Sequence, residues 1–408
     1  VDQGVDPDMG PRHYFLNNYY ADMGALAEAV FHKGYEWPFD PAKVTGGSSL
    51  IDLLVLQETE ILNRRVFMDF RINPVGDDRL GTFLAEKLPD TVREYWISSG
   101  LTGDLPIERL EQLNPNAAAL FREHCINLKD EPLEIAVCAQ HSNGGLSGDI
   151  WWESTNCRHF FPVGEINGSH GVYRPGGTAL NSGQVAAFRV SQKIAREYNQ
   201  ATLQLPKALN KASDAVKEMI SWAKLLTIGN DTGKMSGTET IVAAEQADRS
   251  GRSFKQELQR RMSSHGALLR DPKQVAVALE EAAHQMKAFR ELRVSRERLP
   301  WAFKLRHLLI AQQCYLTAIQ DYIQVGGGSR GSFLVLNPEG EALHPKLPDA
   351  FRCRSENRKL KEYLQLLTWM PAAAQASCRW IDRRPIPDED TWFERMWADY
   401  SSGSVFRN

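Results

Sequence analysis

The chain has 408 residues, of which 42% are hydrophobic and 24% are charged, and its formal net charge is −3. This composition is typical of a globular protein in water, and the length predicts two or three domains rather than one core. The small net charge gives no electrostatic reason to expect nucleic acid or an anionic membrane as a partner. No apolar stretch reaches the ~18 residues that span a bilayer, and no leader is evident, so a cytoplasmic location is expected.

The cysteines are far apart and include no Cys-x-x-Cys pair. This spacing indicates neither a zinc site nor a disulfide framework, so we expect unpaired thiols and no bound metal. The six residues are Cys125, Cys138, Cys157, Cys314, Cys353 and Cys378.

The first 138 residues combine helical and strand patterns. Apolar spacing predicts helices at 17–32, 47–63, 80–96 and 105–121, and two short apolar runs predict strands at 65–70 and 134–138. The segment Met9-Gly-Pro-Arg12 precedes the first of these helices. By itself, Arg12 has the character of an ordinary surface arginine.

Two glycine-rich loops follow. The first contains His141, Gly144 and Gly145, and a lone histidine in such a loop is more often structural than chemical. The second follows a short buried strand predicted to begin at Phe161, and its closely spaced glycines allow backbone to approach a flat ligand. The alternative is a glycine-rich connection that binds nothing.

A helix is predicted after the second loop, over 181–198. Backbone N–H groups near Ala179 and Leu180 would then lack partners within the helix, and together with the helix dipole they would favour negative charge. The sequence therefore predicts a cradle for an anion or a cofactor at this point.

Beyond residue 200 the composition changes to that of a helical bundle, with apolar stripes at intervals of three and four. The predicted buried stripes are Val275, Leu279, Ala282, Met286 and Phe289, and Leu308, Ala311, Tyr315, Ile319 and Tyr322. The run from Gly326 to Gly331 fits Gly-x-Gly-x-x-Gly, but a long helix precedes it where a dinucleotide fingerprint needs a strand, so we reject that interpretation. The last segment, rich in proline and tryptophan, is interpreted as an extension wrapped on the body or on a partner.

Four motifs in this order resemble the flavoprotein family of fumarate reductase, succinate dehydrogenase and L-aspartate oxidase. Met9-Gly-Pro-Arg12 is similar to the family's Gly-Pro-Arg segment, and Val66-Phe-Met-Asp69-Phe is similar to its Val-Tyr-Leu-Asp-Leu strand. The loop from Gln140 to Leu146 resembles its His-Tyr-Thr-Met-Gly-Gly-Ile loop. The stretch from Val163 to Leu180 resembles its Gly-Glu, His-Gly-Ala-Asn-Arg and Asn-Ser-Leu elements.

The chain also departs from that family. The histidine of the first loop is displaced by one position, and Tyr173, Pro175 and Ala179 replace the usual Asn, Leu and Ser. No Rossmann-type unit with Gly-x-Gly-x-x-Gly for the ADP half of FAD precedes these motifs. Residue 1 is Val rather than Met, so we expect that this unit belongs to a longer polypeptide, is supplied by another chain, or has been removed.

The fold class implied by the resemblance is α+β. It is a partial FAD-dependent oxidoreductase fold, with a capping domain and the C-terminal part of the FAD domain followed by an α-helical bundle. The expected divisions are a capping-domain-like segment at 1–138, the C-terminal part of the FAD-binding domain at 139–200, the bundle at 201–335 and a C-terminal extension at 336–408.

The resemblance implies a flavoprotein that uses FAD to act on a C–C single or double bond next to a carboxylate. His141, His170 and Arg174 would hold the carboxylate substrate, and Arg12 would donate a proton. Glu165 would bind the ribityl or ribose hydroxyls of FAD, while Gly144, Gly145, Ala179 and Leu180 would face the cofactor.

A different class of function stays open, in which the chain is a non-catalytic subunit or fragment of a flavoprotein complex that cannot hold FAD alone. The absent ADP-binding unit favours this alternative, whereas the joint presence of Arg12, His141, His170 and Arg174 favours the enzyme. Implied partners are a small carboxylate and the chain or segment that would supply the ADP-binding half.

Overall fold

The computed structural model divides the chain into two compact units. The first comprises Val1–Gln140 and Ser329–Ser355, and the second comprises His141–Gly328 and Glu356–Asn408. The structure describes residues 2–4, 13–34, 36, 38–139, 144–170, 176–198, 205–227, 252–385 and 388–406. The four-part division expected from the sequence stays a prediction.

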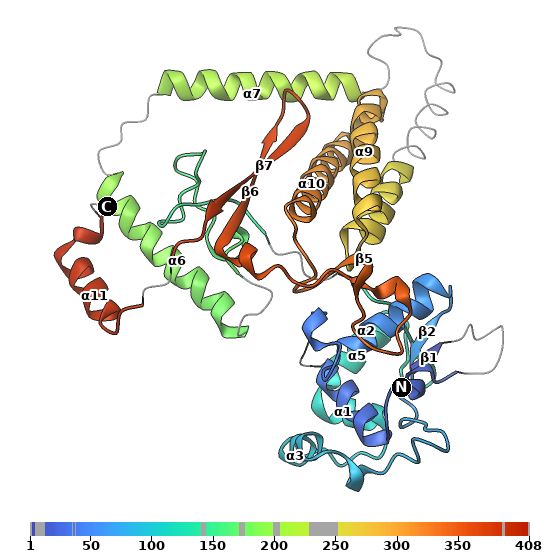
Figure 1. Cartoon of the computed structure of the whole chain (residues 1–408). Helices are drawn as coiled ribbons and strands as arrows, with labels where there is room; N and C mark the ends of the chain where they lie inside the picture. The colour runs from blue at the N-terminus through green and yellow to red at the C-terminus, as the bar shows by residue number, and fades with distance from the viewer. Residues whose placement is uncertain are drawn as a thin grey trace, which may run out of the picture. The chain divides into compact units, whose positions relative to one another are not determined.

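The first unit contains short helices and a small sheet (Figure 1). Its helices are α1 (Met23–Lys33), α2 (Ser49–Leu56), α3 (Asp90–Ser98), α4 (Pro106–Leu113) and α5 (Pro115–Glu123), and its strands are β1 (Asp2–Gly4), β2 (Val66–Met68), β3 (Leu133–Ile135) and β5 (Leu334–Glu341).

The three strands β1, β2 and β3 form an antiparallel sheet in that order, with Val66 opposite Ile135 and Met68 opposite Leu133. Both predicted strands are therefore present, although each is shorter than expected. Val66 of β2 and Leu53 and Leu54 of α2 are fully buried.

Two predicted helices of this unit begin later than expected. α1 starts at Met23 because the Asp22 side chain accepts a hydrogen bond from the Ala25 N–H at 2.8 Å, which satisfies a free amide of the first turn. The helix predicted over 80–96 is helical only from Asp90, directly after Pro89, apart from one 3-10 turn at Ala85–Lys87. Residues 15–18 form a separate 3-10 turn, although residues 17 and 18 were predicted to begin the helix over 17–32.

The second unit contains the long helices and a two-stranded hairpin (Figure 1). Its helices are α6 (Gly176–Glu197), α7 (Leu205–Leu226), an unlabelled helix at 252–261, α9 (Pro272–Ala288), α10 (Leu299–Gln324) and α11 (Trp392–Ser402), and its strands are β4 (Leu269–Arg270), β6 (Tyr363–Met370) and β7 (Gln375–Asp382).

Helices α9 and α10 pack side by side, as Figure 1 shows, and the helix at 252–261 packs with them. The predicted stripe of α10 is only partly right, because Ile319 is buried but Leu308 and Tyr315 are 41% and 44% exposed. The other predicted stripe is mostly confirmed, since Val275, Ala282 and Phe289 are buried, but Gln285 is more buried than Met286. The side chains that α10 buries are Ala302, Leu305, Leu309, Gln312, Gln313, Leu316, Ile319 and Ile323.

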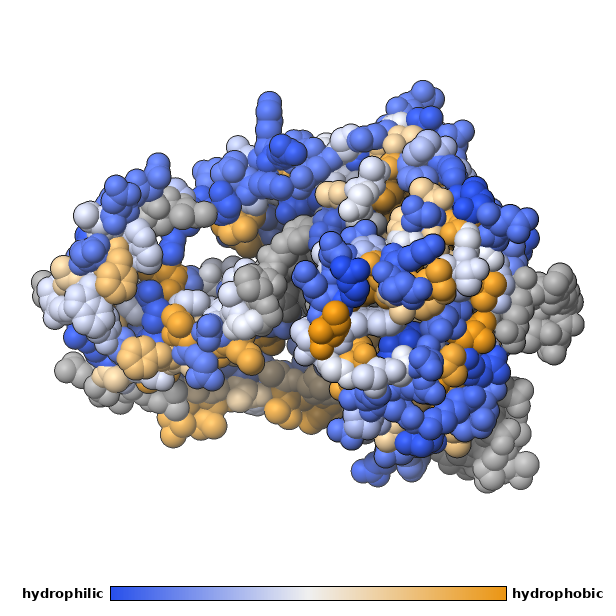
Figure 2. Space-filling model, turned by 90° about the horizontal axis from the view of Figure 1, so that it is seen from below, coloured by the Kyte–Doolittle hydropathy of each residue, from blue (hydrophilic) through white to orange (hydrophobic). Residues whose placement is uncertain are grey.

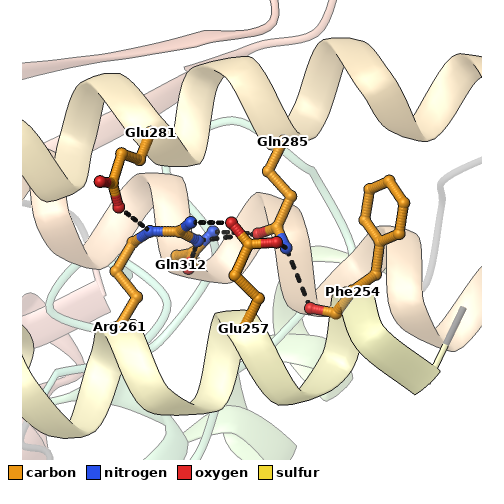
Figure 3. Close-up of polar contacts among 6 residues, drawn as sticks. All are labelled: Phe254, Glu257, Arg261, Glu281, Gln285 and Gln312. Carbon is orange, nitrogen blue, oxygen red and sulfur yellow. Dashed lines mark hydrogen bonds and ion pairs between the residues drawn. The ribbon is translucent and has the colours of Figure 1, made fainter. Parts of the chain in front are cut away.

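Arg261 explains why glutamines occupy these buried positions (Figure 3). Its guanidinium donates to Gln285 Oε1 at 2.8 Å and to Gln312 Oε1 at 3.0 Å, and it forms ion pairs with Glu257 and Glu281 at 2.5 and 3.0 Å. The side chain of Arg261 is only 3% exposed. The network joins three helices, and its buried donors and acceptors find partners in one another, which limits the desolvation cost.

The hairpin of β6 and β7 is attached to α10 through one carboxylate. Asp321 Oδ2 accepts hydrogen bonds from Gln365 Nε2 at 2.7 Å and from Trp380 Nε1 at 2.8 Å. The C-terminal segment therefore contributes an ordered hairpin to this unit.

Among the described residues, the side chains of α7 are covered only near its C-terminal end, where Leu226 joins a core that includes Phe289 and Leu305. An open groove of about 390 Å³ lies along the helix, lined by Ala215, Val216, Met219, Ile220 and Ala223 of α7 and by Phe303. On the face drawn in Figure 2, hydrophobic side chains also reach the surface in several places among hydrophilic ones. Among the described residues, no helix combines the length and hydropathy needed to cross a membrane.

Candidate functional site

The two glycine-rich loops contact each other through their backbones. The Leu146 N–H donates to Ile166 O at 2.7 Å, and Asn167 Nδ2 donates to Leu146 O at 3.1 Å. A Cβ on Gly145 would lie 2.1 Å from Ile166 O, and one on Gly168 would lie 2.5 Å from Gly145 N. Gly168 also has a φ of +71°, in the left-handed region, so neither position has room for a side chain.

The second loop packs in turn against α6. Its 3-10 turn η5 (Gly164–Asn167) begins at Gly164, where a Cβ would be 3.7 Å from the Cα of Gly183 in α6. The prediction of a buried strand beginning at Phe161 is wrong, because residues 161–163 form no strand and lead directly into η5. Pro162 cannot donate a ladder hydrogen bond, and the φ of +77° at Gly164 turns the chain away from an extended course.

α6 begins at Gly176, earlier than the sequence predicts. The amides that precede the first intrahelical hydrogen bonds are therefore those that begin at Gly176 and Gly177, and not those of Ala179 and Leu180, which lie further into the helix. A Cβ on Gly177 would meet no described atom within 4 Å, so the backbone is accessible at this point. The positive end of the helix dipole that the sequence predicts is therefore present, but it lies about one turn earlier in the chain than expected.

His170 lies just before α6 and has unusual surroundings. Both ring nitrogens, Nδ1 and Nε2, are shielded from solvent and have no hydrogen-bond partner among the residues that the structure describes. A buried polar atom without a partner costs free energy, and such atoms are few in folded proteins.

The other predicted site residues are only partly described. Arg12, His141 and Arg174 lie outside the described residues, so their convergence with His170 stays a prediction. Glu165 is exposed in η5, and Gly144 adjoins Gly145 at the contact between the loops. The structure thus brings together the two glycine-rich loops and packs the second loop, which ends at His170, against α6 at Gly183.

A cluster of charged and polar side chains, which sequence reasoning missed, holds the segment between these two loops against α6. Lys193 Nζ forms ion pairs with Glu153 at 2.9 Å and with Asp149 at 3.5 Å, and Tyr198 Oη donates to Glu153 at 2.5 Å. The one local signal of it is the spacing of Lys193 and Glu197, which are four residues apart and 3.9 Å from each other in the structure. The cluster positions residues 149–159 against the helix that carries the candidate site at its other end.

Burial alone would raise the pKa of Glu153, but hydrogen bonds from Tyr198, from the His159 N–H and from Lys193 lower it from 4.5 to about 2. A carboxyl whose pKa is lowered on folding contributes stability above its unfolded pKa and loses it as pH falls toward the folded pKa. We expect Glu153→Gln to remove stability at neutral pH and to flatten the decline in stability between pH 4.5 and about 2. Urea denaturation at several pH values measures this.

The control for that measurement is Glu280→Gln, which changes an exposed glutamate of α9. This variant is expected to keep the pH dependence of the parent chain. An unchanged decline in Glu153→Gln would contradict the assignment of the low pKa to this carboxyl.

Comparison with known proteins gives one curated relative in sequence and several relatives in fold. A protein described as a fumarate reductase (CoM/CoB) subunit, from Methanothermobacter marburgensis, is 30% identical over 118 residues, which are 28% of this chain and 21% of that protein. No family model matches the chain.

Among solved structures, a quinol-fumarate reductase with menaquinol molecules aligns with a TM-score of 0.50 and 15% identity, over 80% of this chain and 46% of that one. The Sdh1 complex of Mycobacterium smegmatis in the apo form aligns with a TM-score of 0.48 and 14% identity, over 80% of this chain and 53% of that one. The chain thus spans about half the length of these structures. Part of the chain is thus similar in sequence to the fumarate reductase subunit, and its fold is similar to that of the quinol-fumarate reductase structure, which agrees with the resemblance that its motifs predict.

Proposed function

We propose that this chain provides the part of an FAD-dependent oxidoreductase that faces the flavin ring and the substrate, and that the reaction changes a C–C single or double bond next to a carboxylate. The observation that carries the proposal is His170, whose two ring nitrogens are shielded and have no partner among the described residues, at the end of the glycine-rich loop that packs against α6. The similarity to the fumarate reductase of Methanothermobacter marburgensis gives the class of reaction.

The residues present fit the ring end of FAD. The amides of Gly176 to Thr178 carry the positive end of the α6 dipole, which suits the negative charge that a reduced flavin holds at N1 and O2. The open space at Gly177 permits the approach of a flat group to the backbone. Exposed Glu165 would bind ribityl or ribose hydroxyls, with Gly144 and Gly145 on the neighbouring loop. When bound, FAD would supply the hydride chemistry.

The side chains of the chain would hold the substrate. His170 would donate from a ring nitrogen to a substrate carboxylate, and Arg174 would grip the same carboxylate with two parallel N–H groups. His141 would hold the other end of the substrate. Arg12 would donate a proton to the substrate carbon, which requires a desolvated setting because a guanidinium normally keeps its proton. These roles follow the resemblance residue by residue.

We further propose that the ADP half of FAD is held by a segment or chain beyond these residues. The sheet of β1, β2 and β3 and the hairpin of β6 and β7 are both antiparallel, whereas a dinucleotide-binding unit needs parallel strands around a helix. The alignment covers 46% of the quinol-fumarate reductase chain, so more than half of that chain lies outside the part that this chain matches.

The flavin-loaded protein tests the role of His170. We expect His170→Asn to weaken binding of succinate and of fumarate by about tenfold or more, because one charge-assisted hydrogen bond to a carboxylate is lost in a desolvated site. Perturbation of the flavin absorbance spectrum during titration measures the affinity, and the flavin content per chain is determined in the same sample.

The matched control is His159→Asn, which changes a histidine that packs on Tyr198 at a ring distance of 4.4 Å, away from the start of α6. It is expected to bind both dicarboxylates as the parent does. Equal affinity in His170→Asn and the parent, at equal flavin content, would remove His170 from the substrate site.

A further inference from the structure

α7 carries an apolar seam along its whole length. The residues of this seam recur at alternating intervals of four and three, which is the 3.5-residue period of a coiled coil. They are Leu205, Leu209, Ala212, Val216, Met219, Ala223 and Leu226. Because this period keeps one stripe facing a neighbouring helix over several turns, it indicates a helix that lies along α7 rather than across it.

Among the described residues, the second unit covers only the C-terminal end of the seam. Leu226 is fully buried in a core with Phe289 and Leu305, and Trp222 packs against the same core. The guanidinium of Arg306 in α10 lies 4.7 Å over the Trp222 ring. The C-terminal end of α7 is therefore fixed on α10, and the rest of the seam extends away from this attachment.

The seam is exposed from Leu205 to Met219. Leu209 and Val216 are 59% and 56% exposed, and a continuous row of such side chains marks an interaction site rather than ordinary surface. The open groove of about 390 Å³ lies beside the C-terminal half of the seam, and Phe303 of α10 also lines it. A helix laid on the seam would therefore contact α10 as well as α7.

Uncharged residues flank the seam on both sides. In coiled coils the charges at these flanking positions select the partner, and like charges there repel. The flanking residues of α7 are Pro206, Ala208, Ser213, Ala215, Ile220 and Trp222. The charged residues of α7, among them Lys211, Lys217 and Glu218, fall at positions on the other side of the helix. A second copy of α7 would thus meet no like charge across the seam.

We infer that the seam of α7 pairs with the seam of a second copy of this chain, as an antiparallel pair of helices. A two-fold axis lets one surface serve both copies, provided that the surface does not repel itself, and the uncharged flanks of the seam meet that condition. A parallel pair would bring the two cores at the C-terminal ends of α7 together, whereas an antiparallel pair keeps them apart.

A two-fold axis at the level of Asp214 uses the exposed part of both seams. Leu209 then lies against Met219 of the partner subunit, since both are five residues from Asp214. Ala212 likewise lies against Val216 of the partner subunit, and the small alanine lets the two backbones come close. Asp214 itself is on the polar side of the helix, so the axis brings no carboxylates into the interface.

The size of this surface suits a weak dimer. A helix of 22 residues is ~33 Å long. Together with the groove beside Phe303, each copy would bury roughly 500 Å² and the pair about 1,000 Å², near the lower limit of a specific interface. The net charge of −3 on each chain adds little repulsion between the copies. We therefore expect a dissociation constant on the order of 10 µM.

Analytical ultracentrifugation of the 408-residue chain, at concentrations from about 1 to 200 µM, tests this inference. We expect a reversible equilibrium between monomer and dimer. Leu209→Glu and Val216→Glu should each weaken the dimer by about tenfold or more, because every dimer then carries two carboxylates in an apolar interface. The matched control is Asn210→Glu, which adds the same charge at an exposed position outside the seam and should change the constant by less than about twofold.

The free energy of unfolding of Leu209→Glu, measured at a concentration at which the parent is monomeric, identifies what covers the seam. An unchanged value is expected, since this side chain is exposed in the single chain. A monomer destabilised by Leu209→Glu would show that another segment of the same chain covers the seam, which would overturn the inference. A parent that stays monomeric throughout, or a dimer that Leu209→Glu and Asn210→Glu affect equally, would overturn it as well.

Discussion

Gly145→Ala is expected to lower the free energy of unfolding of the second unit by about 3 kcal/mol, at the upper end of single-residue effects. The added Cβ would lie 2.1 Å from Ile166 O and 2.4 Å from Gly168 N, so two backbones that are hydrogen-bonded across this contact would have to separate. Since backbone cannot rotate aside as a side chain does, the cost cannot be relieved locally. Urea denaturation followed by circular dichroism measures the change.

Gly183→Ala is the matched control, since its Cβ would lie 3.8 Å from Gly164 Cα, an ordinary van der Waals distance. Within α6 this substitution is expected to be neutral or to stabilise by up to about 1 kcal/mol. If Gly145→Ala were as stable as Gly183→Ala, the close approach of the two loops would be incorrect.

Arg261→Met is expected to destabilise the helical part of the second unit by about 3 kcal/mol. Methionine fills a similar length, but it leaves Gln285 and Gln312 buried without the donor that both now share. Glu281, with 55% of its side chain exposed, can turn to water, so the main loss lies in the buried amides. Chemical denaturation monitored by helical circular dichroism reports the effect.

Arg260→Met provides the control, because Arg260 is the preceding residue and is exposed. A change of less than about 0.5 kcal/mol is expected there. Similar stabilities for the two variants would show that the network in Figure 3 does not hold the three helices together.

These buried amides also explain where sequence reasoning failed in the bundle. Apolar spacing located α9 and α10, but in α10 it selected a face with Leu308 and Tyr315, which are exposed. The real buried face carries Gln312, and a glutamine is stable there only because a residue 51 positions earlier supplies its partner. A pattern within one helix contains no information about that partner.

In the candidate site, too, the sequence predicted local features but not the segments that they contact. The glycines predicted a close backbone approach, and the structure supplies one, but between Gly145 and Gly168 of the chain itself. That contact joins two loops and is not visible in either loop alone. The start of α6 was misplaced because Gly176 and Gly177 have low helix propensity, although both are helical in the structure. Which residues surround His170 depends on the fold rather than on spacing.

Flavin binding by the 408-residue chain, measured by quenching of flavin fluorescence in the parent and in Gly177→Ala, tests most directly whether the start of α6 faces the flavin ring. The parent is expected to bind FAD and FMN weakly and with affinities within about threefold, since contacts to the ADP half would come from outside the chain. Gly177→Ala should stabilise α6 by roughly 0.5–1 kcal/mol and yet weaken flavin binding by about tenfold, because the new methyl group would occupy the open approach to the backbone. A stabilised Gly177→Ala with unchanged flavin affinity, or tight FAD binding that FMN does not match, would contradict this placement of the cofactor.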